Sequence, residues 1–176
     1  MTPPYKTRVL IVDDHAAVRD GLAAFLEAFD DLVLVAQAAS GTEALHLCSW
    51  FQPDVVLMDL MMSELDGVTT TSLIRQLYSD IQVIALASSD DKNLIDAALE
   101  AGAIGSLHKD VPASELAGAI RAAHAGKPCA VDLKKPNGDG SIVANRSTVN
   151  GTSEFNATVQ PHRSLPLWRG KNLQDT

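Results

Sequence analysis

Three acidic residues come directly after short apolar segments that are typical of β-strands. Asp13 and Asp14 follow the segment 8–12, and Asp59 follows the segment 55–58. In open α/β sheets, ligands bind at the carboxyl ends of the strands, so we expect these carboxylates to share one crevice. Carboxylates held close together repel one another, and such a cluster raises a pKa or recruits a cation. Because oxygen-only ligand sets favour hard ions, the sequence predicts a Mg²⁺ site there.

Each of these charged residues also has a simpler interpretation. A single Asp at the end of a strand is most often a helix cap or an exposed loop residue. Two adjacent acids after one strand and a third after its neighbour favour a shared site instead. Lys109 follows another strand-like segment. It could reach the same crevice and offset negative charge added to Asp59, or it could be a solvated surface lysine.

The first 127 residues alternate between strand-like and helical segments. The strand-like segments are 8–12, 32–36, 55–58, 83–87 and 105–108, and a helical segment follows each of them. This alternation predicts an α/β fold of the doubly wound (βα)5 type, with a parallel sheet, right-handed crossovers and helices on both faces. Trp50 and Phe51 are expected to close the second helix against the core.

The periodic pattern ends at about residue 127. Beyond Pro128 no helical or strand period persists, and residues 134–141 have the composition of a linker. We therefore predict one domain over residues 7–127, followed by a linker and a disordered tail over residues 128–176.

Charge and composition exclude several classes of function. Residues 1–127 hold eight basic and eighteen acidic residues, a net charge of −10, whereas the remainder carries +2. An acidic body argues against non-specific binding of nucleic acids, because attraction to phosphates is the largest sequence-independent contribution to such binding. The sequence shows neither an apolar run of roughly 18 residues nor a signal-peptide pattern, so we expect a cytoplasmic protein without a membrane partner. Cys48 and Cys129 have no C-x-x-C spacing and are interpreted as free thiols.

Four motifs together resemble the receiver domain of bacterial two-component response regulators. They are Val-Leu-Ile-Val-Asp-Asp-His at 9–15, Val-Val-Leu-Met-Asp-Leu at 55–60, the Asp66-Gly67 pair, and Gly-Ser-Leu-His-Lys-Asp at 105–110. The set is specific, although no single motif would be, and the resemblance covers about residues 7–127. It implies a flavodoxin-like, five-stranded parallel sheet with strand order 2-1-3-4-5.

The resemblance also implies a function in a phosphorelay. A histidine kinase or phosphotransfer protein would pass a phosphoryl group to Asp59 in a Mg²⁺-dependent reaction. Asp13, Asp14, Asp59 and the backbone carbonyl of Met61 would hold the metal, and Lys109 would pair with the phosphoryl group. Such a protein is a switch rather than an enzyme, with limited self-phosphorylation and autodephosphorylation. Its expected partners are the kinase and, through helix faces, a second copy of itself.

Three positions depart from the pattern of the family. The Thr or Ser that usually ends the fourth strand corresponds to Ala87, which has no hydroxyl. Ser88 or the serine after it could substitute if the loop shifts, or both could be ordinary loop serines. A switch position that is usually aromatic corresponds to Ser106, which is too small for a change between buried and exposed rotamers. Phosphorylation should survive these changes, whereas the path of the conformational signal is open.

Two other functions are considered. The first is a transcription regulator of the response-regulator class whose helix-turn-helix output domain is missing or altered. About fifty residues follow Gly126 and they lack helical periodicity, so we expect no specific DNA binding by this chain as it stands. The second is a hydrolase of the haloacid dehalogenase type with Asp59 as nucleophile. That class needs an acid two residues later, where this chain has Met61.

Overall fold

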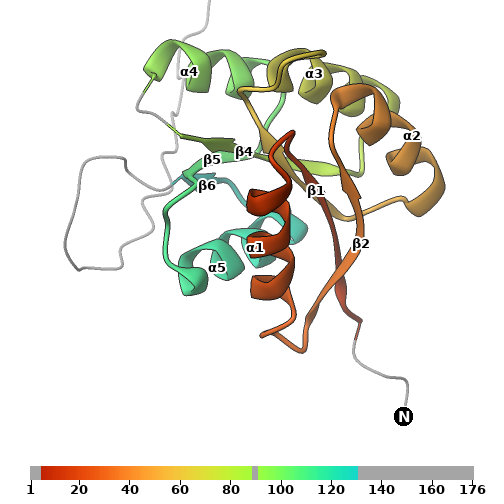
Figure 1. Ribbon diagram of the computed structural model, residues 1–176, viewed down its shortest axis with the longest axis vertical. Coiled ribbons are helices and arrows are strands. Elements are labelled where there is room, and N and C mark those ends of the chain that lie inside the picture. The colour runs from red at the N-terminus through yellow and green to blue at the C-terminus, as the bar shows by residue number, and fades with distance from the viewer. Residues whose placement is uncertain (1–4, 89–90, 131–176) are drawn as a thin grey trace, which may run out of the picture. The chain divides into compact units, whose positions relative to one another are not determined.

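The computed structural model of the chain describes residues 5–88 and 91–130 (Figure 1). Strands and helices alternate in chain order, as predicted. The strands are β1 (Thr7–Val12), β2 (Leu32–Ala38), β3 (Val55–Asp59), β4 (Gln82–Ala87), β5 (Gly105–His108) and β6 (Cys129–Ala130). The helices are α1 (Ala16–Leu26), α2 (Gly41–Phe51), α3 (Gly67–Leu77), α4 (Lys92–Glu100) and α5 (Ala113–His124).

All strand pairings are parallel, in the order β2-β1-β3-β4-β5-β6. The predicted order 2-1-3-4-5 is confirmed, and β6 extends the sheet beyond β5. Strand β6 was not predicted from the sequence, because two residues are too short to show a strand period. It lies at the start of the range expected to be linker, and residues 131–176 of that range lie outside the described residues.

The sheet separates two layers of helices (Figure 1). The buried residues form three hydrophobic clusters, of which the two largest lie on opposite faces of the sheet. Val9 and Ile11 of β1 face the layer of α1 and α5, where they pack with residues such as Ile120. Leu10 and Val12 face the opposite layer of α2 and α3. Every residue of β3 is buried, as expected for a strand covered on both faces.

Polar residues and glycine mark the ends of several helices. The hydroxyl of Ser40 accepts a hydrogen bond from the backbone N–H of Glu43 and so caps α2. The carboxylate of Asp66 accepts one from the N–H of Thr69 and caps α3 in the same way. Gly102 has a φ of +105° just after α4, a conformation that disfavours other residues. Among the described residues, no helix combines the length and apolar character needed to cross a membrane.

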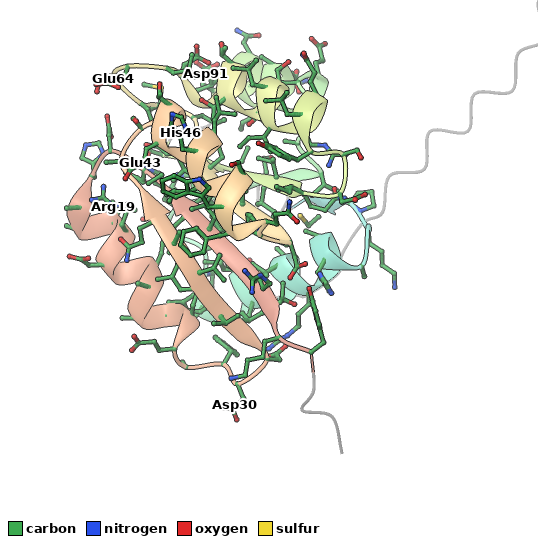
Figure 2. The ribbon with its side chains drawn as sticks, turned by 90° about the vertical axis from the view of Figure 1, so that its right-hand side faces the viewer. Arg19, Asp30, Glu43, His46, Glu64 and Asp91 are labelled. Carbon is green, nitrogen blue, oxygen red and sulfur yellow. The ribbon has the colours of Figure 1, made fainter. Side chains whose placement is uncertain are left out.

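One expectation about the core is wrong. Trp50 is 76% exposed and Phe51 is 39% exposed, so they do not close α2 against the core. The face of α2 that packs inward is formed by Ala44 and Cys48, which are fully buried. Exposed carboxylates, among them Asp30, Glu43 and Glu64, project from the surface of the domain (Figure 2).

Candidate functional site

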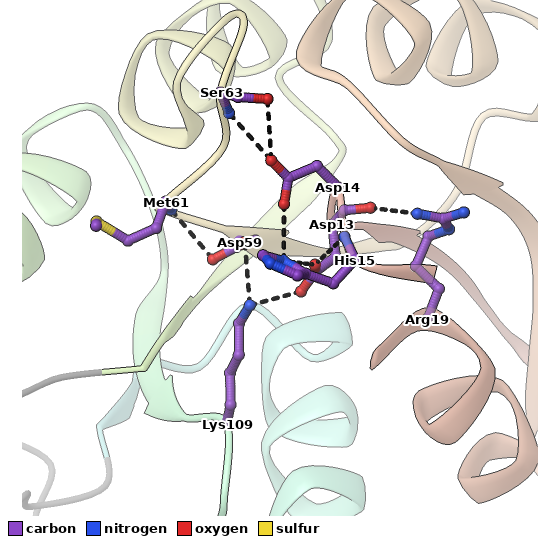
Figure 3. Close-up of polar contacts among 8 residues, drawn as sticks. All are labelled: Asp13, Asp14, His15, Arg19, Asp59, Met61, Ser63 and Lys109. Carbon is purple, nitrogen blue, oxygen red and sulfur yellow. Dashed lines mark hydrogen bonds and ion pairs between the residues drawn. The ribbon is translucent and has the colours of Figure 1, made fainter. Parts of the chain in front are cut away.

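The register of the sheet brings Asp13 and Asp59 together. Val12 of β1 pairs with Met58 of β3, so the residue that follows each of them stands at the same edge of the sheet. Both carboxylates are fully buried. Together with Asp14 and His15, each offers a ligand atom, and these four atoms all lie within 4.8 Å of one another (Figure 3). The predicted convergence of the three carboxylates is therefore present in the structure.

Lys109 reaches the same crevice from the end of β5 (Figure 3). Its Nζ lies 2.6 Å from Oδ2 of Asp13 and 3.0 Å from Oδ2 of Asp59, and only 14% of its side chain is exposed. Burial lowers the pKa of Lys109, but the contacts with the two carboxylates outweigh it and raise the pKa above its ordinary value. Lys109 is therefore a charged partner of the acidic cluster rather than a solvated surface lysine.

Asp14 is held from the opposite side of the crevice by Ser63. Oδ2 of Asp14 accepts hydrogen bonds of 3.1 Å from both the N–H and the hydroxyl of Ser63. Burial raises the pKa of Asp14, while these bonds and the nearby imidazole of His15 lower it by more. The net effect is a pKa below the ordinary value, so Asp14 is an anion at neutral pH.

The backbone that follows Asp59 turns tightly against it. Oδ1 of Asp59 accepts a hydrogen bond of 3.1 Å from the N–H of Met61. A side chain at Gly67 would place its Cβ only 2.0 Å from the backbone oxygen of Asp59. Gly67 therefore lets α3 begin directly beside the strand that carries this carboxylate.

The donor set fits a divalent cation. Oδ1 of Asp14 and Oδ2 of Asp59 are buried and have no hydrogen-bond partner among the described residues. The Lys109 contact with Asp59 is an ion pair without the alignment of a hydrogen bond. Buried carboxylate oxygens left in this way are the ligands that Mg²⁺ prefers. The carbonyl of Met61 as a further ligand stays a prediction.

The three predicted switch positions lie near the ends of β4 and β5. Ala87 is 2% exposed and packs in a cluster that includes Leu60 and Ile95. Ser88 is exposed, and Ser106 is 9% exposed within β5. The last residue of β4 thus brings no hydroxyl toward the carboxylates, as expected from the sequence. The roles of these positions in signalling stay predictions.

The contact of Arg19 with the site was not anticipated from the sequence. The guanidinium of Arg19 donates a hydrogen bond of 2.7 Å to the backbone oxygen of Asp13 and ties α1 to the end of β1. The side chain of His15 is 68% exposed, and its Nδ1 lies 2.8 Å from Oδ1 of Asp14 and 3.2 Å from Oδ1 of Asp13.

Residues 9–121 match the response regulator receiver domain family, and the chain belongs to that family. It is 46% identical over 121 residues to the transcriptional regulatory protein LiaR of Bacillus subtilis strain 168, an alignment that covers 69% of this chain and 57% of LiaR. The chain spans about half the length of the curated relatives it matches. Family membership favours the receiver over the hydrolase considered above.

Solved receiver structures agree with the fold. One is a two-component response regulator of the LuxR family from Aurantimonas sp. SI85-9A1, with a TM-score of 0.68 and 33% identity, covering 73% of this chain and 91% of that one. Another is the signal receiver domain of NarL from Mycobacterium tuberculosis, with a TM-score of 0.68 and 31% identity, covering 70% of this chain and all of that one. Response regulator receiver domains are signalling switches, and this chain is one of them.

Proposed function

We propose that the chain accepts a phosphoryl group on Asp59 from a histidine kinase or phosphotransfer protein, in a Mg²⁺-dependent reaction. One observation carries this proposal: a fully buried carboxylate, Asp59, lies 3.0 Å from the ammonium of Lys109 and has a ligand atom within 4.8 Å of those of Asp13 and Asp14. A buried carboxylate beside a fixed cation and an acidic cluster is suited to nucleophilic chemistry on a phosphoryl donor.

The transfer is a displacement at phosphorus, with the Asp59 carboxylate as the attacking group and the histidine of the donor as the leaving group. An oxygen of the Asp59 carboxylate forms a bond to phosphorus, and the bond from phosphorus to the donor's histidine nitrogen breaks in line with it. The nitrogen keeps the electron pair and takes up a proton. The N–H of Met61 steadies the carboxylate through its 3.1 Å hydrogen bond to Oδ1. The product is an acyl phosphate on Asp59.

Charge compensation is divided between the metal and Lys109. In this proposal Asp13, Asp14, Asp59 and the carbonyl of Met61 would hold Mg²⁺, which would supply positive charge to offset that of the phosphoryl oxygens. Lys109, now bound to two carboxylates, pairs with the new phosphoryl group. The phosphoryl group carries a charge of roughly −1.5 to −2 at neutral pH in place of the single negative charge of the carboxylate, and this larger charge redistributes the contacts of Lys109. Slow hydrolysis of the acyl phosphate then resets the switch.

The new charge would alter contacts with partner proteins. The chain would act in the cytoplasm, where its kinase partner presents the phosphohistidine, and would self-associate through α1 and α5 or through α4, β5 and α5. Ala87 lacks the hydroxyl that is usual at its position, and Ser106 lacks the aromatic ring that is usual at its own, so neither group can take part in this response. The response would therefore depend more on Lys109 and its loop.

A second candidate is the regulatory half of a transcription regulator. The observation in its favour is that LiaR, 46% identical over the shared region, is a transcriptional regulatory protein. In that case, phosphorylation of Asp59 would control binding of DNA by an output domain. Binding of DNA by the present chain is not part of this proposal.

The experiment is intact mass spectrometry after incubation with acetyl phosphate and Mg²⁺. Wild type should gain the mass of one phosphoryl group, and chelation of the metal should abolish the gain. Asp59→Asn should gain nothing, whereas Asp80→Asn, an exposed control, should behave as wild type. Equal labelling of wild type and Asp59→Asn, or labelling that survives chelation, would overturn the proposal.

A further inference from the structure

The imidazole of His15 lies beside the carboxylates of the proposed metal site, although 68% of its side chain is exposed. Its Nδ1 lies 2.8 Å from Oδ1 of Asp14 and 3.2 Å from Oδ1 of Asp13. The other oxygen of each carboxylate is engaged elsewhere: Oδ2 of Asp13 binds Lys109, and Oδ2 of Asp14 binds Ser63. His15 therefore belongs, with Asp13, Asp14 and Asp59, to one group of candidate ligand atoms that all lie within 4.8 Å of one another (Figure 3). Within this group, Oδ1 of Asp13 already accepts the backbone N–H of His15 and lies within hydrogen-bond distance of its Nδ1.

The contact between His15 and Asp14 is not an ordinary hydrogen bond. Oδ1 of Asp14 is buried and, among the described residues, has no partner aligned as a donor, even though Nδ1 is only 2.8 Å away. Two ligands at right angles on one ion, each at about 2.1 Å, lie about 3 Å apart. The distances from Nδ1 to the two oxygens, 2.8 and 3.2 Å, bracket that separation.

A nitrogen donor changes which ion such a site prefers. Mg²⁺ takes oxygen ligands and keeps much of its water, so an imidazole contributes little to its binding. First-row transition ions bind imidazole well, and their affinity at a mixed nitrogen and oxygen site rises from Mn²⁺ to Ni²⁺. A receiver site with carboxylates and one imidazole should therefore discriminate between these ions and Mg²⁺.

We infer that His15 is a ligand of the metal site through Nδ1, and that it gives the site a preference for Mn²⁺ and Ni²⁺ over Mg²⁺. The inference rests on the proposed metal-dependent function, since it adds a ligand to the same site. It concerns the identity of the ion and not the identity of the phosphoacceptor.

The test is isothermal titration of the full chain with each metal alone: Mg²⁺, Mn²⁺ and Ni²⁺. His15→Ala should weaken Ni²⁺ binding on the order of tenfold or more, and Mn²⁺ binding by less, while Mg²⁺ binding changes little. His15→Gln, which keeps a polar side chain, should behave in the same way. His46→Ala removes an exposed histidine of α2 instead and should change none of the three affinities (Figure 2).

Electron spin echo spectroscopy of bound Mn²⁺ gives a second readout. The ¹⁴N modulation of a coordinated imidazole should be present in wild type and His46→Ala and absent in His15→Ala. The fold should tolerate the substitution, because the backbone N–H of His15 keeps its 2.8 Å hydrogen bond to Oδ1 of Asp13. Only the side-chain contacts of Nδ1 with Asp13 and Asp14 are lost.

The outcomes separate the two proposals. If Mg²⁺ binds but His15→Ala weakens all three metals equally, or none of them, the inference about His15 is wrong and the proposed function stands. Absence of the ¹⁴N signal in wild type would also overturn it. If wild type binds none of the metals, the inference and the proposed Mg²⁺ dependence both fail.

Discussion

The ammonium nitrogen of Lys109 lies 2.6 Å from Oδ2 of Asp13, although 96 positions of sequence separate the two residues. The carboxylate of Asp13 is fully buried, so this cation replaces part of the water that the anion loses on folding. The same nitrogen lies 3.0 Å from Asp59. Lys109 therefore links the ends of β1, β3 and β5 before any phosphoryl group is present.

Replacing Lys109 should destabilise the metal-free protein. Lys109→Ala leaves two buried carboxylates without their cation, a change that costs about 3 kcal/mol in comparable buried pairs. The measurement is urea unfolding at pH 7 in the presence of a chelator. Lys127→Ala, at an exposed lysine, is the matched control and should change the free energy of unfolding by less than about 0.5 kcal/mol.

The pH dependence of this effect has a definite sign. The pKa of Lys109 is raised above its ordinary value of 10.5, so its contribution is complete at neutral pH and is lost only as the pH rises through the folded value. The difference in stability between wild type and Lys109→Ala should therefore be constant near neutrality and shrink in strong alkali. Equal stabilities at pH 7 would show that the ion pair is not formed.

Asp66 offers a separate test at acid pH. The hydrogen bond from the N–H of Thr69 is the main cause that holds the pKa of Asp66 below its ordinary value of 3.8. A lowered pKa stabilises the fold above pH 3.8, and that contribution is lost as the pH falls through the lower, folded value. Asp66→Ala should cost about 1 kcal/mol at pH 7, as expected for loss of a helix cap.

Asp66→Asn is the matched comparison for that variant. Asn also caps helices, so it should recover most of the stability at pH 7 without the charge. The stability difference between wild type and Asp66→Asn, followed by thermal unfolding from pH 7 to pH 2, should fall in acid. A difference that grows in acid would contradict the assignment.

The sequence predicted the chemical core of the site because each member stands at the carboxyl end of a strand-like segment. Asp59 is the last residue of β3, Asp13 and Asp14 come just after β1, and Lys109 comes just after β5. The doubly wound topology brings those ends together. The hydrogen bonds from Ser63 to Asp14 could not be predicted in this way. They depend on the path of the loop after Asp59, and no periodicity encodes that path.

Exposure was harder to predict than topology. A Trp-Phe pair at the end of a helix suggests a core contact from its apolar character alone. In the structure, α2 turns its small residues Ala44 and Cys48 toward the sheet, which leaves Trp50 exposed. Strand β6 was missed for a different reason, because a strand of two residues is too short to show a period. Its close approach to β5 at Gly105 is a tertiary contact that its own sequence does not reveal.

Gly67 should be intolerant of even the smallest side chain. Its Cβ would lie 2.0 Å from the backbone oxygen of Asp59 and 2.8 Å from Cα of Leu60, and backbone atoms cannot move aside cheaply. Gly67→Ala should lower the free energy of unfolding by at least about 2 kcal/mol. Gly118→Ala is the control, because nothing lies within 4 Å of its Cβ.

The control should move in the opposite direction. Gly118 lies within α5, where alanine favours the helix by roughly 0.5–1 kcal/mol. Chemical unfolding of both variants measures the two changes in the free energy of unfolding, which should be negative for Gly67→Ala and positive for Gly118→Ala. If Gly67→Ala were as stable as wild type, the close approach of Gly67 to the backbone of Asp59 would be contradicted.

The two cysteines test the packing of β6. Burial raises the pKa of Cys48 to about 12 and that of Cys129 to about 11. Because the thiolate is the reactive form, neither should react readily with a thiol reagent in the native protein at pH 8. Both should react once the chain is unfolded. Cys129 should be the faster of the two in native protein, since a two-residue strand at the sheet edge opens more easily than the core around Cys48.

Gly105→Ala should then release Cys129 selectively. A Cβ at position 105 would lie 1.5 Å from the backbone oxygen of Cys129, so β6 would have to leave the sheet. Time-resolved mass spectrometry of the labelled protein should show faster modification of Cys129 in this variant and unchanged protection of Cys48. If both cysteines became reactive together, the substitution would be unfolding the domain as a whole. If neither did, Gly105 and β6 would not be in the contact described.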